Sequence, residues 1–580
     1  MKKRKTKIQD YTVLFMIGLA LLFLILRAPY GWCFNDEPFL VTLAQRIYMG
    51  DSLLVDEWNP SQVTGVLLLP FYALFHIFSR DNTGILLTFR YFYCVLWFAT
   101  CVVVFRTVKQ QSKSRITSLC VFFYLILFAP LDYMTLSYTS LGLMSCLLLC
   151  CLLLNGGSKS RTPWYVYSMI LSFLIGSLVL CAPHMVLAYI VAWVGAVVLL
   201  IKKGQSDDCV YYEKSKVLSI AYLGVAAGVY CYYLIFSRID LMSLLPSIQM
   251  ILAKPDSVMR SNILVRLFYC VKSIINKSLI YSLCIVGCSL MSTFFRKRMR
   301  HIRVWMFALC SAGFLWAQFC FLTDQMDTKF NYQMIDIALL GFAAFAMLDT
   351  RPWNLFYSFS CIGFVYTLLR WAGTDTGLFS AGMTLTVCGV SSIIFVILLC
   401  QEMREQYKEN KIVRVIPMVL CTGILILQLF SESYVKLFRQ YWDRSPVMLR
   451  ETVEVGAAKG LRTNRDDKQA YEARYAELKQ LLENVDEDNP DIGFVSLTSS
   501  PIIYLDANLR FGVFSSWTFP YCEVLCKTLE QYREINPKCR QTVFFAEKDD
   551  VPEDFKPEQF EFFKAQESVL FASPAVLRQP

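Results

Sequence analysis

Apolar segments of about 20 residues recur along most of this chain and decide what it can fold into. There are thirteen, at residues 11–30, 83–105, 116–131, 136–154, 164–182, 184–201, 217–236, 264–292, 304–322, 332–348, 354–370, 378–400 and 412–431. An α-helix of about 20 apolar residues crosses the hydrocarbon core of a bilayer. Because 56% of the chain is hydrophobic and only 18% is charged, the sequence predicts an α-helical, multi-pass membrane protein and not a soluble one.

The loops between these segments alternate in charge, which predicts the side of the membrane on which each lies. Every second loop, beginning with RTVKQQSKSR at 106–115, is basic, whereas the alternate short loops contain a single Lys. Loops rich in Lys and Arg stay on the cytoplasmic side. With a cytoplasmic N-terminus the alternation holds through all thirteen segments and places residues 432–580 outside. No small-residue cleavage site follows the first apolar run, so we expect an uncleaved span.

Two domains are therefore expected. Residues 1–431 form the membrane domain, whose first outer loop covers 31–82, and residues 432–580 form a soluble extracytoplasmic domain. This tail holds 19 Lys and Arg against 25 Asp and Glu, and the rest of the chain holds 37 against 21. The positive surplus lies in short loops, where it sets topology, so we expect a lipid bilayer and no nucleic acid as partner.

The tail has the pattern of a small α/β domain. Helical periodicity at 466–485 and 521–535 alternates with strand-like runs at 493–497, 511–517 and 542–546. Such alternation is typical of helices packed on a sheet. The tail contains neither a phosphate-binding loop nor a nucleophile elbow.

The first outer loop contains two helical segments that we interpret as lying on the membrane surface. The segment 63–78 is apolar enough to span, but a span there would turn every later basic loop outward. The segment 39–49 has apolar residues at helical spacing, with Pro38 suited to its first turn and Gly50 to its end. The loop is thus predicted to be two surface helices joined by GDSLLVDEWNP.

Two acidic pairs lie in this loop at the lipid–water boundary. Asp36 and Glu37 precede the first surface helix, and Asp56 and Glu57 lie in the connection between the helices. A carboxylate in a partly dry cleft can accept the proton of a hydroxyl nucleophile, but Asp36 or Glu37 would also serve merely to cap the helix. The second pair either lines an acceptor site or binds a divalent ion, or forms a solvated turn.

Basic residues near the outer side are candidates for phosphate contacts. Arg90 lies about seven residues inside its segment, where a buried guanidinium costs about 2.5–3.5 kcal/mol and requires a partner. That partner is either a lipid phosphate or one of the carboxylates Asp36 and Glu37, unless the side chain snorkels to the headgroups. Arg260 and Arg370 belong to a wider set of outer-facing cations that serve as phosphate ligands or as boundary anchors.

Metal and cofactor signals are sparse. The chain has three histidines and no Cys/His spacing typical of zinc, so we expect no metal site and no cofactor, although the loop carboxylates would suit a divalent ion. His184, between two segments on the outer side, is either a catalytic residue or an ordinary loop histidine. Most of the 22 cysteines lie in apolar runs, and Cys522, Cys526 and Cys539 could include one disulfide.

The local order of these features resembles one superfamily. The run NDEPFLVTLAQRIYMGD (35–51), the surface segment 63–78 and the next span with Arg90 resemble the GT-C membrane glycosyltransferases, in the branch of protein O-mannosyltransferases and lipid A aminoarabinose transferases. The resemblance implies one-step, inverting transfer of a sugar from a polyprenyl-phosphate donor to an extracytoplasmic acceptor, which is a cell-envelope polymer, a glycolipid or a protein. It further implies that Asp36 assists the attacking hydroxyl and that arginines hold the leaving phosphate.

The chain departs from that family in two places, and two other functions stay open. The family places a Lys before a Pro where this chain reads NPSQVTG, and the second outer loop offers only Asp132. A lipid-linked sugar flippase or exporter is one alternative, although ionisable residues gather at loop ends and not along a path through the bundle. A non-catalytic, glycan-binding paralogue is the other. Compact loops favour a bacterial cytoplasmic membrane.

Overall fold

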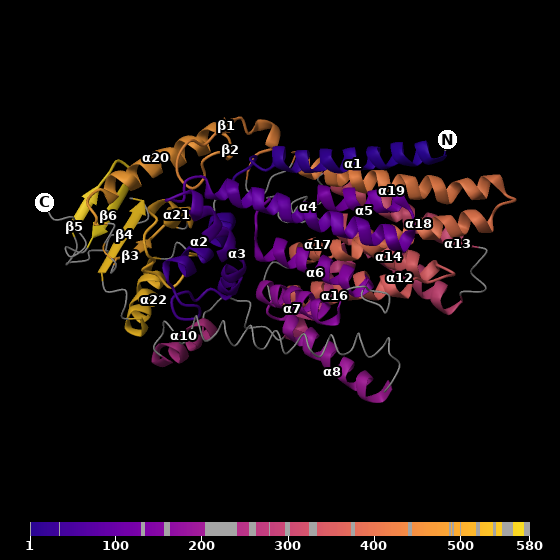
Figure 1. The fold of residues 1–580 in the computed structure, drawn as a ribbon, viewed down its shortest axis with the longest axis horizontal. Helices are drawn as coiled ribbons and strands as arrows, with labels where there is room; N and C mark the ends of the chain where they lie inside the picture. The colour runs from indigo at the N-terminus through magenta and orange to yellow at the C-terminus, as the bar shows by residue number, and fades with distance from the viewer. Residues whose placement is uncertain are drawn as a thin grey trace.

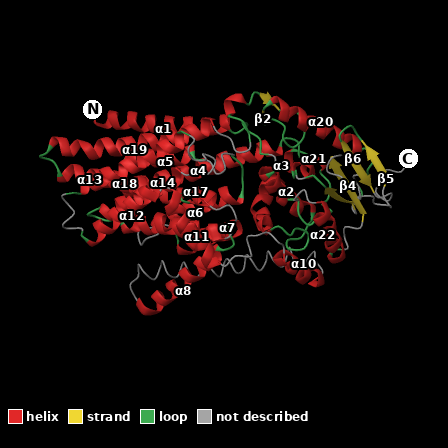
Figure 2. Cartoon of the chain, turned by 180° about the vertical axis from the view of Figure 1, so that it is seen from behind, coloured by secondary structure: helices red, strands yellow, loops and turns green. Residues whose placement is uncertain are grey.

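The computed structural model of the chain describes residues 2–33, 35–128, 134–155, 163–203, 241–253, 263–277, 279–295, 302–323, 333–372, 378–438, 443–486, 489, 492–498, 500–517, 522–536, 541–547 and 561–572. Long helices run side by side through most of its length, and a small sheet lies at one end (Figure 1). The N-terminus lies at the end of the bundle that is far from the sheet, and the C-terminus lies beyond the sheet (Figure 1). Strands gather at that end alone among the described residues (Figure 2).

Helices occupy every predicted apolar segment that the structure describes. They are α1 (Lys2–Arg27), α4 (Ile85–Ser112), α5 (Arg115–Leu127), α6 (Tyr138–Asn155), α7 (Trp164–Cys181), α8 (Met185–Lys203), α11 (Ile263–Lys277), α12 (Leu279–Phe294), α13 (Arg303–Leu322), α14 (Gln333–Met347), α15 (Trp353–Leu355), the π-helical turn η7 (Phe356–Cys361), α16 (Ile362–Ala372), α17 (Leu378–Thr384), α18 (Thr386–Gln406) and α19 (Lys411–Phe438). The predicted segment 217–236 lies outside the described residues, so the number of thirteen spans stays a prediction.

The predicted segment 264–292 is occupied by α11 and α12, which flank residue 278, outside the described residues. Arg266 is a charged residue within this apolar segment, and α11 contacts α16 and α17. The predicted boundary after residue 431 falls inside α19, which continues to Phe438.

The central helices approach closely because small residues meet at their contact. A Cβ on Gly341 of α14 would lie 1.9 Å from Ser392 Oγ of α18, so only glycine fits there. Ser360 of η7 and Ser391 of α18 share a hydrogen bond of 2.7 Å. Small residues and serine hydroxyls are the usual contacts between helices in membranes.

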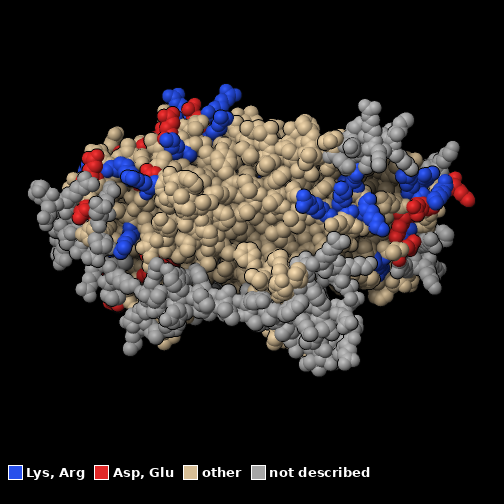
Figure 3. Space-filling view, viewed as in Figure 1, with Lys and Arg blue, Asp and Glu red and all other residues tan. Residues whose placement is uncertain are grey.

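The bundle has the surface of a multi-pass membrane protein. Seven helices among the described residues are long and apolar enough to cross a membrane: Ser61–Phe78, Ile85–Ser112, Tyr138–Asn155, Arg303–Leu322, Trp353–Ala372, Thr386–Gln406 and Val413–Phe438. A broad uncharged belt separates charged residues at the sheet end from mostly basic residues at the other end (Figure 3). Large apolar side chains of the long helices, such as Val95, Phe173 and Trp316, are exposed, as lipid-facing residues are.

The first outer loop forms the two predicted helices, and the structure packs them on each other. They are α2 (Asp36–Met49) and α3 (Gly65–Phe78), with the 3-10 turn η1 (Pro60–Thr64) before α3. Length and composition alone would allow Ser61–Phe78 to span, but α3 lies across the direction of the long helices, beside α2 (Figure 1). The contact is tight, since a Cβ on Gly65 would lie 2.8 Å from Leu43 O.

The tail is the small α/β unit that the sequence predicts. A four-stranded sheet has the order β3 (Ile492–Ser496), β4 (Gln541–Glu547), β6 (Ser568–Ala572) and β5 (Glu561–Lys564), in which β3 and β4 are parallel and the other pairs antiparallel. A two-stranded ribbon, β1 (Glu451–Thr452) and β2 (Arg462–Thr463), precedes it. The helices are α20 (Arg465–Leu482), α21 (Ile502–Ala507) and α22 (Cys522–Ile535).

One predicted strand is absent. Residues 511–517 form no strand and make only an isolated bridge from Phe511 to Phe494. Their backbone carbonyls instead accept hydrogen bonds from the first outer loop. Phe514 O accepts from Trp58 N at 2.7 Å, and Val513 O accepts from Arg46 Nη2 at 2.8 Å. The run is apolar because it is buried between the two domains and not because it lies in the sheet.

Candidate functional site

The N-terminal end of α2 brings the first acidic pair to the outer end of the bundle. The helix begins at Asp36, three residues earlier than the predicted segment 39–49. Asn35 occupies the capping position, and its side chain makes no capping hydrogen bond. Asp36 and Glu37 lie in the first turn. Neither acid is therefore the helix cap, which was the structural alternative to a role in chemistry.

Glu37 forms a buried ion pair with Arg90 of α4. Arg90 Nε lies 2.7 Å from Glu37 Oε1, and Arg90 Nη2 lies 2.6 Å from Glu37 Oε2. Both side chains are almost fully buried. This two-point contact matches a guanidinium fork to a carboxylate and fixes the first turn of α2 against α4.

Backbone carbonyls accept hydrogen bonds from the remaining N–H groups of Arg90. Its Nη1 donates to Ala28 O at 2.8 Å and Tyr30 O at 3.2 Å, and its Nη2 donates to Gly31 O at 2.9 Å. All five N–H donors of Arg90 are thus engaged within the chain. This geometry fits the ion-pair alternative for Arg90 and leaves none of its donors for a lipid phosphate, and both carboxylate oxygens of Glu37 accept from Arg90.

Asp36 is the carboxylate of this turn that is not paired with Arg90, so it is the one that could accept a proton in a reaction. Its side chain is half-buried, and the one hydrogen bond it receives from a described residue comes from Cys33 Sγ at 3.9 Å. Burial raises the pKa of the Asp36 carboxyl to about 6. A carboxylate with that pKa is ionised at neutral pH and is a stronger proton acceptor than an ordinary aspartate.

The second acidic pair belongs to a buried network around Arg46. Arg46 Nε lies 2.8 Å from Asp51 Oδ2, and Arg46 Nη1 lies 3.1 Å from Glu57 Oε2. Glu57 Oε1 also accepts from Asn59 N at 2.8 Å. The exposed fraction of Arg46 is 1% and that of Glu57 is 3%, so the predicted solvated turn is wrong for this residue.

Asp56 ties the same turn to the tail. Its Oδ2 accepts from Ser52 N at 2.6 Å, and its Oδ1 accepts from the amide of Asn536. Asp56 is 7% exposed, which again contradicts a solvated turn. Within the described ranges, no three His, Cys, Asp or Glu side chains meet as a metal site would require. Asp56 and Glu57 therefore hold the two domains together.

A cluster of cations, not seen as a cluster in the sequence, lies at the outer ends of α7, α11 and α16. Arg370 Nη1 donates to Cys181 O at 3.4 Å, and its guanidinium lies 4.4 Å from the centre of the Tyr138 ring. Arg266 Nη1 donates to Ala372 O at 2.9 Å. The sequence missed Arg266 because it lies inside what reads as one long apolar span.

His184 lies beside this cluster. The side chain is half-buried, and burial together with the positive charges of Arg370 and Arg266 lowers its pKa. The imidazole is therefore neutral near pH 7 and available as a hydrogen-bonding group. Arg370, Arg266 and His184 are called the outer cation cluster below.

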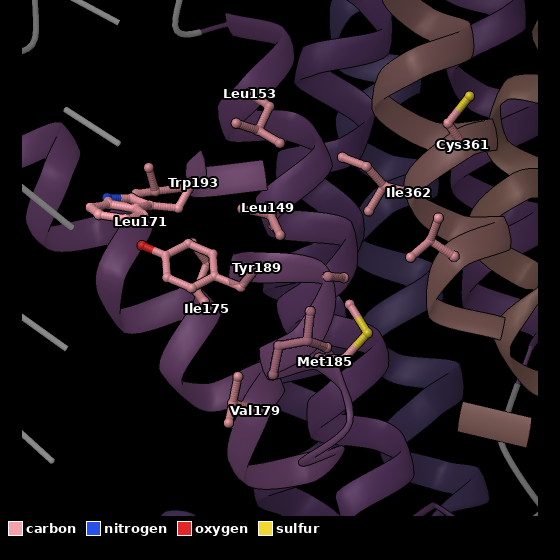
Figure 4. A pocket seen from close by; sticks show the side chains of 13 residues that line it. Leu149, Leu153, Leu171, Ile175, Val179, Met185, Tyr189, Trp193, Cys361 and Ile362 are labelled. Atoms are coloured by element: carbon pink, nitrogen blue, oxygen red, sulfur yellow. The ribbon is translucent and has the colours of Figure 1, made fainter. Parts of the chain in front are cut away.

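An apolar groove lies between helices of the bundle. Helices α6, α7, α8 and α16 line a cavity of about 330 Å³ with side chains that include Leu149, Ile175, Met185, Tyr189, Trp193 and Ile362 (Figure 4). Met185, which lines this groove, directly follows His184 in the chain, and Arg370, Arg266 and His184 are not among the described residues that line it. Thr64 Oγ1 donates to Leu180 O at 3.2 Å, which connects the surface-helix pair to the same end of α7.

Some predicted residues lie outside the described part of the chain. Arg260 and Asp132 do, as does Cys539. Between residues 204 and 262 the structure describes only α10 (Leu241–Ala253), which contacts α22 of the tail. Roles for Arg260 and a disulfide among the tail cysteines stay predictions.

Comparison with known proteins finds similarity at the level of structure alone. No protein-family model and no curated protein sequence matches the chain. Among solved structures, apo ArnT from Cupriavidus metallidurans is similar over 98% of both chains, with 11% identity and a TM-score of 0.44.

Two other solved structures are similar in the same way. ArnT from the same organism bound to undecaprenyl phosphate is similar over 98% of this chain and 99% of that one, with 10% identity and a TM-score of 0.40. The Archaeoglobus fulgidus oligosaccharyltransferase in its apo form is similar over 93% of this chain and 69% of its own, with 10% identity and a TM-score of 0.40. These are GT-C membrane glycosyltransferases, the superfamily that the sequence resembles. At TM-scores below 0.5 the likeness adds no argument about activity.

Proposed function

We propose that this chain is a membrane glycosyltransferase that moves a sugar from a polyprenyl-phosphate donor to an acceptor outside the membrane. The observation that carries the proposal is the state of Asp36. This half-buried carboxylate lies at the outer end of a membrane bundle, with a raised pKa of about 6, while its neighbour Glu37 is fully used by Arg90. Burial of a carboxylate without a cationic partner is costly, and such groups are concentrated at functional sites.

Asp36 acts as the general base in the proposed reaction. The acceptor hydroxyl attacks the anomeric carbon of the donor sugar and gives its proton to the Asp36 carboxylate. The bond between that carbon and the phosphate oxygen breaks, and its electron pair leaves with the lipid phosphate. Attack opposite the leaving group inverts the anomeric centre. The step requires no cofactor, since a side-chain carboxylate supplies the base.

The donor is proposed to bind in the apolar groove with its phosphate at the outer cation cluster. A polyprenyl chain is apolar along its whole length and suits a groove lined by Leu149, Ile175 and Ile362. Arg370 and Arg266 supply positive charge where the leaving phosphate gains negative charge. The link from Thr64 to Leu180 holds the surface helices beside this end of the groove.

The proposal also includes the orientation of the chain in the membrane. We place the N-terminus in the cytoplasm and the tail outside a bacterial cytoplasmic membrane. The end of the bundle that is far from the tail carries mostly Lys and Arg (Figure 3), which agrees with the positive-inside rule. An acceptor in the cell envelope, whether polymer, glycolipid or protein, would then meet Asp36 from outside.

The test is sugar transfer by purified protein in nanodiscs. A panel of radiolabelled polyprenyl-phosphate sugars is supplied with envelope extract, and the label that leaves the lipid is counted. We expect transfer by the wild type and a fall of about 10²–10⁴-fold in Asp36→Asn. Asp466→Asn is the matched control, because Asp466 is an exposed tail carboxylate (78%) and its replacement should change nothing.

A second pair of variants tests the groove. Val365 lines the groove and is 39% exposed, whereas Val103 on α4 is 40% exposed and does not line it. Val365→Trp should raise the KM for the lipid donor, and Val103→Trp should not. Equal transfer by the wild type and Asp36→Asn would remove Asp36 from the mechanism. Release from no donor, together with donor movement across proteoliposomes, would favour the flippase instead.

A further inference from the structure

A second, polar cleft lies where the C-terminal ends of the surface helices meet the tail. Its volume is about 560 Å³, and its walls include Tyr48 of α2, His76 and Arg80 at the end of α3, and Asn508 and Arg510 of the tail. It has no part in the proposed transfer step. Tyr48 lies twelve residues beyond Asp36 on α2, which places the cleft about 18 Å from the base at 1.5 Å per residue.

The floor of this cleft is a hydrogen-bond network that joins both domains. Asn82 Oδ1 accepts from Tyr72 Oη at 2.8 Å, and Asn82 Nδ2 donates to Leu505 O at 2.9 Å and to Asn508 Oδ1 at 3.1 Å. Tyr72 is fully buried and Asn82 is 3% exposed. The cleft is therefore formed before any ligand arrives, which lowers the entropic cost of binding.

One wall of the cleft consists of two stacked rings. The ring of Tyr48 stacks on that of His76, with 5.3 Å between centroids and an interplanar angle of 20°. Tyr48 is 50% exposed although it is a large aromatic residue on a helix whose other face is buried. A flat, exposed aromatic ring is a surface on which the C–H face of a sugar ring packs, because the ring face is electron-rich. Asn508 at the edge offers an amide to hydroxyl groups.

The described residues that line the cleft include two arginines. Arg80 from the membrane domain and Arg510 from the tail are both exposed at its rim. Among the described residues that line it, none is acidic. The carboxylate of Asp81, next to Arg80, accepts from Thr83 and Ser79, which turns its charge toward its own loop. Two arginines at a rim favour a ligand that carries carboxylates or phosphates.

We propose that this cleft binds an anionic saccharide segment of the acceptor. The role as an acceptor subsite rests on the proposed transferase function, whereas saccharide binding itself does not. A ligand held at Tyr48 while it reacts at Asp36 must span about 18 Å, which is the length of several sugar rings. The acceptor class is therefore an extended glycan with acidic groups, either a polymer or the head of a glycolipid.

Binding of a simple acidic oligosaccharide tests the site directly. Trigalacturonic acid is titrated into the full-length protein in nanodiscs at low salt, and heat is measured by calorimetry, with maltotriose as the neutral probe and inorganic phosphate as the small anion. We expect trigalacturonate to bind more tightly than either. Tyr48→Ala and the double variant Arg80→Ala with Arg510→Ala should each raise its Kd by at least fivefold. Arg450→Ala, at an exposed arginine of the tail, should leave the Kd unchanged.

The outcomes separate the two proposals. Asp36→Asn should bind trigalacturonate as well as the wild type, since the cleft and the base are separate. Binding that survives while no donor releases sugar would keep the cleft and overturn the transferase. Phosphate binding as tight as that of the oligosaccharide would show a simple anion site and overturn the saccharide proposal. So would an unchanged Kd in both the Tyr48 variant and the double arginine variant.

Discussion

The two acidic pairs of the first outer loop differ in how their charges are used. In the pair at 56–57, Glu57 faces Arg46, and Asp56 accepts from Ser52 and Asn536, so both carboxylates have partners. In the pair at 36–37, only Glu37 has a cation, and Asp36 receives one weak thiol contact from a described residue. In our proposal the first pair divides its work between structure and chemistry, whereas both acids of the second pair hold the fold together.

This difference shows that a buried acid is identified by its partners and not by its position in the sequence. Both pairs are Asp or Glu next to a surface helix, and each has a buried arginine within reach. The arginine beside the first pair, Arg90, is saturated by one carboxylate and three carbonyls. Asp36 is consequently left over, and its raised pKa follows from burial without a compensating charge.

The largest expected effect comes from breaking the first ion pair. Arg90→Ala would leave Glu37 charged and buried, and Glu37→Ala would leave Arg90 in the same state. Loss of one partner of a buried pair costs about 3–5 kcal/mol, so both variants should unfold at much lower temperature in detergent. The double change Glu37→Gln with Arg90→Met should recover most of that loss, because no lone charge remains.

Arg106 provides the control for this prediction. It lies on the same helix and is exposed, so Arg106→Ala should change the free energy of unfolding by less than about 0.5 kcal/mol. If Arg90→Ala keeps wild-type thermal stability but loses donor binding, Arg90 is a phosphate ligand after all and the ion pair is incidental.

Breaking the second network should loosen the tail from the membrane domain. Glu57→Ala removes one of the two carboxylates that face Arg46, while Asp51 remains at 2.8 Å. We expect a loss of about 1–3 kcal/mol, seen as faster hydrogen exchange in residues 511–517, whose backbone this turn contacts. Asp466→Asn should leave that exchange unchanged. Lost transfer with unchanged exchange would instead place Glu57 at the acceptor or at a metal ion.

The sequence predicts the helices and strands of this molecule better than it predicts which side chains contact one another. Apolar runs locate the helices because charged loops bound them, although several of the described helices are shorter than a full span, and the alternation in the tail locates β3, β4 and α20. The pairing of Arg90 with Glu37 spans 53 positions, so the sequence allows it but cannot select it over Asp36 or a lipid. Arg46 looks like a solvent-facing residue of a surface helix, and only docking of Val513 and its neighbours makes it buried.

The remaining difference between the pairs should appear in the pH profile of transfer. With its pKa at about 6, the Asp36 base gains activity as it loses its proton, so kcat/KM should rise about tenfold from pH 5 to pH 7 and then level off. Residual activity in Asp36→Asn should not show this rise. A half-maximal rate near pH 4 in the wild type would mean that Asp36 is an ordinary solvated carboxylate.

The smallest expected effect is that of Asp36→Asn on the free energy of unfolding. Whether the variant is more or less stable than the wild type distinguishes a functional acid from a structural one. The pKa of Asp36 is raised in the folded protein. Between about pH 4 and pH 6 the unfolded chain therefore binds fewer protons at this residue than the folded chain does. As a result, the stability that this group contributes is lost as the pH rises through that window. Asp36→Asn cannot ionise and should escape the loss. Relative to the wild type, it should therefore gain about 1 kcal/mol of unfolding free energy between pH 4.5 and pH 7.5, discounted for partial exposure. A variant that is less stable than the wild type at pH 7.5, by the same thermal measurement, would show that the Asp36 charge stabilises the fold, as the charges of Glu37 and Glu57 do.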